Sequence, residues 1–135
     1  MGKEKLEMEE NKRIKSFEDI EVYKLARQFR NKIYELTKKL PDEEKYNLVD
    51  QMRRASLSLT SNIAEGYGRY HYQENIQFCR QARGSLNELM DQLMACGDFG
   101  YVDQKTVETL LMEAREVRRY LNAYIKATIK RQETK

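Results

Sequence analysis

The chain has 135 residues; 35% of them are charged, 40% are hydrophobic, and the formal net charge is +3. This composition predicts one soluble globular domain, and the length leaves no room for a second large one. One proline and six glycines are too few turn formers for a β-sandwich or barrel, and this scarcity favours a few long helices. The nearly balanced charge does not by itself indicate nucleic-acid binding.

The N-terminal residues 1–15 carry five basic and four acidic side chains with few apolar ones between them. We expect them to form a flexible charged arm, followed by the folded domain at 16–131 and a short tail at 132–135. The arm lacks the apolar stretch of a signal peptide, and no run approaches the roughly 20 apolar residues of a membrane span. We therefore expect a cytoplasmic protein without membrane contacts.

The first predicted helix begins at Ser16, which can cap the first amide groups, and its apolar residues recur every three or four positions until Pro41 ends it. A second helix is predicted from Asp42, as its N-cap, to Gly66 and Gly68. Both helices would carry acidic residues in the first turn, where the helix dipole favours negative charge.

Two further helices with the same apolar period are predicted, one from about Tyr72 to Cys96 and one that starts just after Asp103. The connections are short, and short connections force consecutive helices to run antiparallel. The sequence therefore predicts the all-α class, as a single up-down-up-down antiparallel four-helix bundle.

The last predicted helix lies in the basic part of the chain, because residues 101–135 hold eight basic and five acidic side chains. At 100° per residue, five of its cations fall within an arc of about 120° beside the apolar arc. They are Arg115, Arg118, Arg119, Lys126 and Lys130. Such a basic ridge can follow phosphates. The alternative is a solvated helix face whose cations favour the C-terminal end of the helix dipole.

The connection between the second and third helices is rich in aromatic residues, with three tyrosines, an arginine and the only histidine between residues 66 and 72. Arg69 and Tyr70 are candidates for contact with single-stranded nucleic acid, because aromatic rings stack on bases and arginine binds phosphate. The alternative, which the usual behaviour of tyrosine favours, is that the rings close the end of the bundle while the hydroxyls stay solvated.

Polar side chains of the second and third helices can meet across the hairpin that joins them. If the hairpin turns near residues 67–70, Arg53 comes level with residues 85–88, and an ion pair between Arg53 and Glu88 is feasible. We expect such a network to fix the helix register rather than to catalyse a reaction. Its predicted members are Arg53, Asn62, Glu65, Ser85 and Glu88.

Catalysis and metal binding find no support in the sequence. It has no Gly-rich phosphate loop, nucleophile elbow or two-histidine metal motif, and the Glu-x-x-His signature of di-iron bundles is absent. Cys79 and Cys96 fall on one helix, too far apart to pair, and we expect both to be buried thiols. A four-helix bundle also offers no obvious cleft for acid–base chemistry. We therefore expect no enzymatic activity, no cofactor and no metal site.

Four blocks of the sequence resemble a known family. The blocks are Phe17–Ala26, Gln51–Ala55, Ser61–Arg69 and Gly84–Leu89. In this order they are similar to the four-helix-bundle family named for open reading frames in 23S rRNA intervening sequences, and the resemblance spans about Phe17 to Ile129. Two positions depart from the family pattern. Thr60 replaces a usual proline, which we expect to straighten the second helix, and Tyr70–Tyr72 replaces a small polar run.

The resemblance implies a four-helix bundle that assembles as a homopentameric ring and has no catalytic activity. The architecture is also similar, in fold and size, to the accessory variability protein of diversity-generating retroelements, a basic pentameric bundle that works with a reverse transcriptase and its RNA. Five copies at +3 each would carry about +15, and a basic ridge repeated round a ring would become a multivalent phosphate-binding surface.

These features predict a non-enzymatic, oligomeric helical bundle that associates with RNA, in preference to DNA, through the basic ridge on its last helix. The alternative is a scaffold or accessory factor whose ring binds a partner protein such as a reverse transcriptase and touches nucleic acid only incidentally. The sequence leaves this choice open.

Overall fold

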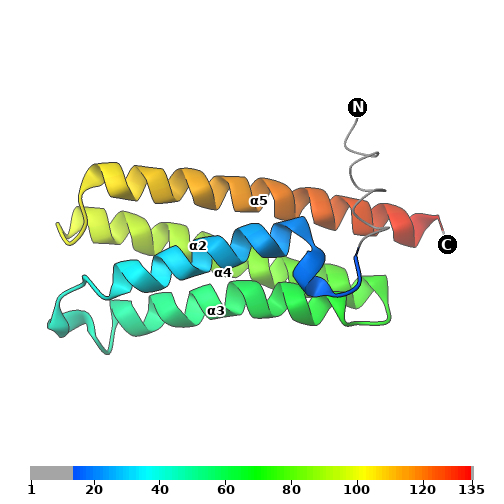
Figure 1. The fold of residues 1–135 in the computed structure, drawn as a ribbon, viewed down its shortest axis with the longest axis horizontal. Helices are drawn as coiled ribbons and strands as arrows, with labels where there is room; N and C mark the ends of the chain where they lie inside the picture. The colour runs from blue at the N-terminus through cyan, green and yellow to red at the C-terminus, as the bar shows by residue number, and fades with distance from the viewer. Residues whose placement is uncertain (1–13, 135) are drawn as a thin grey trace.

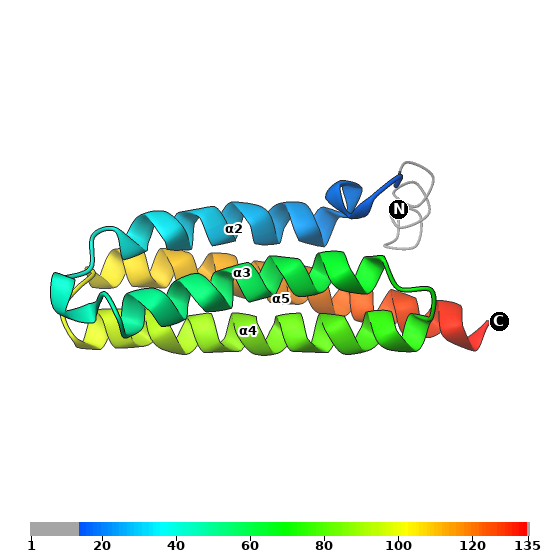
Figure 2. The ribbon, with the colours of Figure 1, turned by 90° about the horizontal axis from the view of Figure 1, so that it is seen from below.

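The computed structural model describes residues 14–134, and within them four long helices form one antiparallel bundle (Figures 1 and 2). The helices are α2 (Glu21–Thr37), α3 (Leu48–Tyr67), α4 (Tyr72–Asp98) and α5 (Gln104–Glu133). The short 3-10 helices η1 (Phe17–Asp19) and η2 (Asp42–Glu44) precede α2 and α3. Each long helix packs against the next, and α5 packs against α2. The predicted up-down-up-down four-helix bundle is therefore confirmed.

The structure describes only part of the predicted N-terminal arm and C-terminal tail. Residues 1–13 of the predicted arm and Lys135 of the predicted tail lie outside the described residues. The last helix continues through Glu133, so the predicted tail at 132–135 begins inside a helix. Between residues 14 and 134, no helix combines the length and the apolar character that a membrane crossing requires.

The two 3-10 helices explain why two long helices start later than the sequence predicts. Ser16 caps η1 rather than α2: its side-chain oxygen accepts a hydrogen bond from the Glu18 amide, and the Asp19 carboxylate accepts one from the Ser16 amide. The prediction that Asp42 caps the second long helix is wrong as well, because Asp42 begins η2 and α3 begins at Leu48. Residues 42–47 bury no side chain, so nothing holds them in a long helix before the apolar period resumes.

The first long helix also ends earlier than predicted, at Thr37 rather than at Pro41. The Thr37 hydroxyl donates to the Tyr34 carbonyl at 2.6 Å. The amides of residues 38–40 then donate to carbonyls three residues back, as in a tightened last turn. The residue before a proline avoids helical backbone angles, so the helix loosens before Pro41 is reached.

The helices are held together by an apolar core that runs the length of the bundle. Its fully buried large side chains include Phe29, Ile33, Met52, Leu59, Ile63, Leu86, Leu89, Leu93 and Leu121. Gly66 allows α3 to approach α4 closely, because a Cβ there would lie 2.9 Å from Asn75 Oδ1 and 3.0 Å from the Phe78 Cβ. The helix α3 is continuous through Thr60, whose hydroxyl donates to the Leu57 carbonyl.

The connections divide between the two ends of the bundle. The turn from α3 to α4 and the C-terminal end of α5 lie at one end, and α5 projects beyond that turn (Figure 2). The connections from α2 to α3 and from α4 to α5 lie at the other end (Figures 1 and 2). The α4–α5 turn contains Gly100, whose φ of +78° favours glycine.

Candidate nucleic-acid interface

Three hydrogen bonds between side chains set α4 and α5 in register. Gln132 donates to Gln73 at 2.9 Å, Arg83 donates to Asn122 at 2.9 Å, and Arg118 donates to Asn87 at 3.3 Å. In each pair the residue numbers sum to the same value, as a regular antiparallel pair of helices requires. The first half of α4 therefore lies along the second half of α5.

One long stretch of each facing half contains no carboxylate, although Glu74, Glu116 and Glu133 border these stretches. Neither residues 75–87 of α4 nor residues 117–132 of α5 include an aspartate or glutamate. We call this region the basic end; its cations are Arg80, Arg83, Arg118, Arg119, Lys126, Lys130 and Arg131. Because the two segments lie side by side, seven cations gather on one part of the molecule.

The remaining halves of the same two helices have the opposite charge. Residues 88–98 of α4 carry three carboxylates and no lysine or arginine, and residues 104–116 of α5 carry three carboxylates and two cations. We call this region the acidic end. The net charge of the chain therefore conceals a strong separation of charge along one helix pair.

The predicted basic ridge is divided between these two regions. Lys126 and Lys130 are exposed within the basic end, and the half-buried Arg118 also contacts Met90 Sδ at 3.7 Å. Arg119 folds back onto its own helix, where both oxygens of Glu116 accept its hydrogen bonds and the pKa of the Glu116 carboxyl falls below its usual value. The fifth residue of the ridge, the exposed Arg115, lies outside the basic end.

Sequence reasoning missed two cations of the basic end, Arg80 and Arg83, because they lie on a different helix from the ridge. Arg80 is exposed, and the hydrogen bond from Arg83 to Asn122 brings it against α5. The absence of carboxylates from both segments was visible in the sequence. It becomes informative only when the helix register shows that the two segments face each other.

The turn between α3 and α4 lies at the same end of the bundle as the basic end (Figure 2). Tyr70 is 92% exposed, and its ring lies nearly perpendicular to the His71 ring, at 5.0 Å between ring centroids. Arg69 instead donates to Glu65 at 3.0 Å and lies over the Phe78 ring. Both predicted contact residues are exposed, and Tyr70 has the larger free surface.

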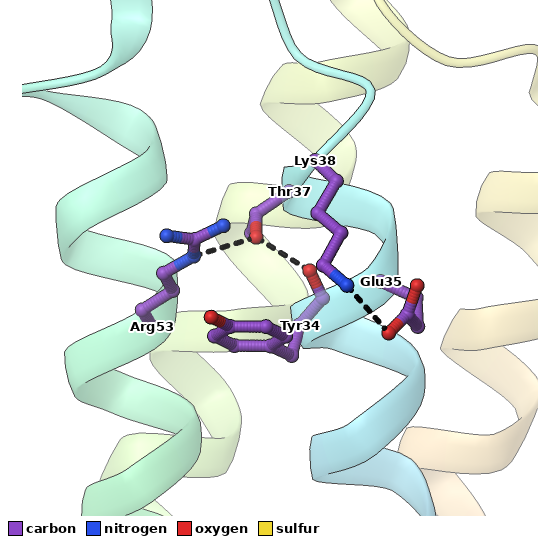
Figure 3. A network of polar contacts seen from close by, with 5 residues as sticks. All are labelled: Tyr34, Glu35, Thr37, Lys38 and Arg53. Atoms are coloured by element: carbon purple, nitrogen blue, oxygen red, sulfur yellow. Dashed lines mark hydrogen bonds and ion pairs between the residues drawn. The ribbon is translucent and has the colours of Figure 1, made fainter.

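The predicted ion pair between Arg53 and Glu88 is wrong. Arg53 turns toward α2 instead, where its Nε donates to Thr37 Oγ1 at 2.9 Å and its guanidinium lies 4.4 Å from the centroid of the Tyr34 ring (Figure 3). Glu88 accepts a hydrogen bond from Gln92 on its own helix. Arg53 therefore ties α3 to α2 and not to α4.

The error comes from the helix register, which the other members of the predicted network reveal. Ser58 and Ser85 share a hydrogen bond at 2.8 Å, so Arg53, five residues earlier, comes level with Met90 rather than with residues 85–88. Asn62 does not bridge the helices either; its amide donates to the Ser58 carbonyl and hydroxyl. Glu65 pairs with Arg69, one turn away. Of the predicted network, only Ser85 joins α3 to α4.

One groove contradicts the expectation that the bundle has no cleft. It lies between α2 and α5 at the acidic end, with a volume of about 690 Å³, and Leu36 and Leu110 are among the residues that line it. Lys32 and Glu113, which also line it, form an ion pair between the two helices. The lining residues include lysines and carboxylates in equal number and neither histidine nor cysteine.

The cysteines behave as expected from the sequence. Cys79 and Cys96 are both free and buried, and burial raises their pKa values to about 12 and about 11. Thiols with such high pKa values are poor nucleophiles and poor metal ligands near neutral pH. Among residues 14–134, no group of three or more histidine, cysteine, aspartate or glutamate side chains is placed to hold a metal ion.

Comparison with known proteins agrees with this fold. A solved structure from Bacteroides thetaiotaomicron, a protein with unknown function from the S23 ribosomal protein family, has 24% sequence identity and a TM-score of 0.72 and covers 78% of this chain and 95% of its own. At that identity the likeness shows a shared fold. No curated protein shows significant similarity to the chain. The family described as 23S rRNA-intervening sequence protein matches residues 18–123. The chain therefore belongs to the 23S rRNA-intervening sequence protein family.

Proposed function

We propose that this protein is a non-enzymatic bundle that associates with RNA, in preference to DNA, through its basic end. The observation that carries the proposal is the pair of facing segments, residues 75–87 and 117–132, which together hold seven cations and no carboxylate. A phosphate backbone that lies along both segments would meet mainly positive charge, with the carboxylates Glu74, Glu116 and Glu133 only at the borders of the segments.

The cations of this surface suit the backbone rather than the base edges of a nucleic acid. Arg80 and Lys126 are exposed, and the structure gives neither a carboxylate partner within residues 14–134. Contacts of this kind set affinity and salt dependence but do not read sequence. The exposed Tyr70 ring at the same end can stack on an unpaired base, which supports RNA with single-stranded loops as the ligand.

The family supports the choice of ligand. Its name refers to sequences within 23S rRNA, which makes structured ribosomal RNA the first ligand to test. We also propose that the chain assembles as a ring, the pentamer that its resemblance implied. Several copies of the basic end would then bind one RNA, and weak individual contacts would add up.

The test is a titration of the protein against a structured 23S rRNA fragment and a duplex DNA of the same length, at several salt concentrations. We expect submicromolar binding to the RNA at low salt, weaker binding to the DNA, and an affinity that falls steeply as salt rises. Light scattering on the same samples gives the mass of the assembly. A triple variant, Arg80→Glu, Arg83→Glu and Lys126→Glu, should lose RNA binding while its circular dichroism spectrum stays helical.

The matched control places the same charge change elsewhere: Lys24→Glu, Arg54→Glu and Lys105→Glu. These three cations are exposed and lie outside the basic end. The control should bind RNA far better than the basic-end variant does. Equal losses in the two variants would show that only the overall charge matters, and absence of binding at low salt would reject the proposal.

A further inference from the structure

The side of the bundle opposite the α4–α5 pair carries a second, different arrangement of cations. The helix α2 contacts α3 and α5, and α4 contacts the same two helices, so the α2–α3 side faces away from the α4–α5 side. We call this surface the Arg53 face. Its residues are Arg27, Arg30 and Tyr34 on α2 and Arg53 and Leu57 on α3.

Arg53 is held in one position by neutral groups. Its Nε donates to Thr37 Oγ1, the Thr37 hydroxyl donates in turn to the Tyr34 carbonyl, and the Tyr34 ring lies against the guanidinium (Figure 3). Among the described residues, no acceptor takes a hydrogen bond from either terminal nitrogen of Arg53, and no carboxylate pairs with it. A half-buried guanidinium is thus fixed in place with its two-pronged donor edge unused.

Arg30 is bound in a similar way on the neighbouring helix. It donates to Thr60 Oγ1 at 3.2 Å and to Asn31 Oδ1 at 3.1 Å, again to neutral acceptors. The carboxylates at the margin of the face are already paired, Glu35 with Lys38 and Asp50 with Arg54. The centre of the Arg53 face is therefore positive without internal compensation.

Apolar surface accompanies these arginines. Leu57 is 60% exposed and Tyr34 is 45% exposed. Leu57 follows Arg53 by one helical turn, and Tyr34 follows Arg30 by one turn. The hydrogen bonds from Arg30 to Thr60 and from Arg53 to Thr37 set α2 and α3 in register, so Leu57 and Tyr34 lie between the two arginines.

We propose that the Arg53 face docks an acidic segment of a partner protein. A carboxylate of that segment would accept two hydrogen bonds from Arg53, and an apolar side chain one turn away would cover Leu57 and Tyr34. Arginine and tyrosine dominate the strongly contributing positions of protein interfaces, and an anchored guanidinium loses little freedom when it binds. An exposed leucine at the centre of the surface gains from apolar contact, which a phosphate backbone does not provide.

The test is a selection from a random peptide display library on the intact protein. We expect the selected peptides to share an aspartate or glutamate one helical turn from a large apolar residue. The best peptide, titrated by fluorescence anisotropy, should bind Arg53→Lys at least tenfold more weakly, because lysine keeps the charge but cannot form two parallel hydrogen bonds. Arg54→Lys is the matched control and should bind as the unaltered protein does, since Arg54 is exposed and already paired with Asp50.

A second variant guards against a folding defect in Arg53→Lys. Leu57 is exposed, so Leu57→Glu should keep the melting temperature and abolish peptide binding by repelling the acidic segment. Selected peptides without acidic residues would overturn the proposal. So would peptide binding by Arg53→Lys and Leu57→Glu that is as tight as that of the unaltered protein. Loss of RNA binding in Leu57→Glu would assign the face to nucleic acid instead, and a change in assembly mass would assign it to a second copy of the chain. Either result would also overturn the proposal.

Discussion

The basic end and the acidic end are built from the same two helices, yet they differ in every charged feature. The basic end has seven cations and no carboxylate, whereas the acidic end has six carboxylates and two cations. The core beneath them is continuous: Leu86 in the basic end and Leu93 in the acidic end are both fully buried. Packing therefore does not require the charge separation.

The helix dipole explains only part of the difference. Lys130 and Arg131 occupy the last turn of α5, where cations stabilise the helix. Arg80 and Arg83 lie well inside α4, beyond the reach of either helix end. Their presence opposite the cations of α5 has no explanation in helix stability, and it supports the binding role that we propose for the basic end.

The comparison between the two ends is tested most strongly by moving charge from one to the other. The variant Arg80→Glu, Arg83→Glu and Lys126→Glu would be combined with Asp91→Lys, Asp98→Lys and Glu108→Lys, which restores the net charge of the chain. We expect RNA binding to remain weaker by on the order of tenfold or more at moderate salt, because the cations no longer lie in the basic end. Recovery of binding, measured in the same titration, would show that position along the helices is irrelevant.

A second prediction concerns the close contact between α3 and α4 beside the basic end. In Gly66→Ala the new Cβ would meet Asn75 and Phe78, so we expect a loss of about 1 to 3 kcal/mol in the free energy of unfolding. Gly84→Ala is the matched control: a Cβ there meets nothing within 4 Å, and alanine favours a helix by roughly 0.5 to 1 kcal/mol over glycine. Urea unfolding of both variants measures the difference. Equal stability of the two variants would show that α3 and α4 can move apart at Gly66 without a cost in free energy.

Two single substitutions separate free cations from paired ones. Lys126→Ala should reduce the slope of log affinity for single-stranded RNA against log salt by about 0.7, the loss of one phosphate contact. Arg119→Ala should change the slope less, because Arg119 must leave Glu116 before it can reach a phosphate. The two slopes come from one set of titrations, and a larger effect of Arg119→Ala would reverse our ranking of these residues.

The fold was largely predictable from the sequence, because the apolar period along each helix and the short connections leave few arrangements of four helices. The helix starts were not, since Ser16 and Asp42 look like caps of long helices and in fact begin 3-10 turns. A capping residue marks the start of a helical turn but not its length. The length depends on which side chains can be buried afterwards.

The candidate site was less predictable, because it depends on contacts between helices. The period within α5 identified Lys126 and Lys130, but only the register between α4 and α5 brings Arg83 beside Asn122. A small error in the position of the α3–α4 turn places Arg53 level with residues 85–88 instead of Met90. The sequence also does not show that Arg53 turns away from α4 toward Thr37 on α2. Side chains that bridge helices therefore need the structure.

The smallest expected effect is on stability, and it concerns a hydrogen bond near the acidic end. The Tyr101 hydroxyl donates to Glu44 Oε2 at 2.7 Å. Hydrogen bonds from Tyr101 and Asn47 lower the pKa of the Glu44 carboxyl from its ordinary value of 4.5. A lowered folded-state pKa means that this contact stabilises the fold above pH 4.5 and that the stabilisation is lost as pH falls through the lowered value. Tyr101→Phe should therefore lower the melting temperature slightly at pH 7, and the difference from the unaltered protein should shrink at pH 3. Glu44→Gln, which cannot titrate, should remove this pH dependence, and a difference that stays constant from pH 7 to pH 3 would show that the hydrogen bond does not depend on the charge of Glu44.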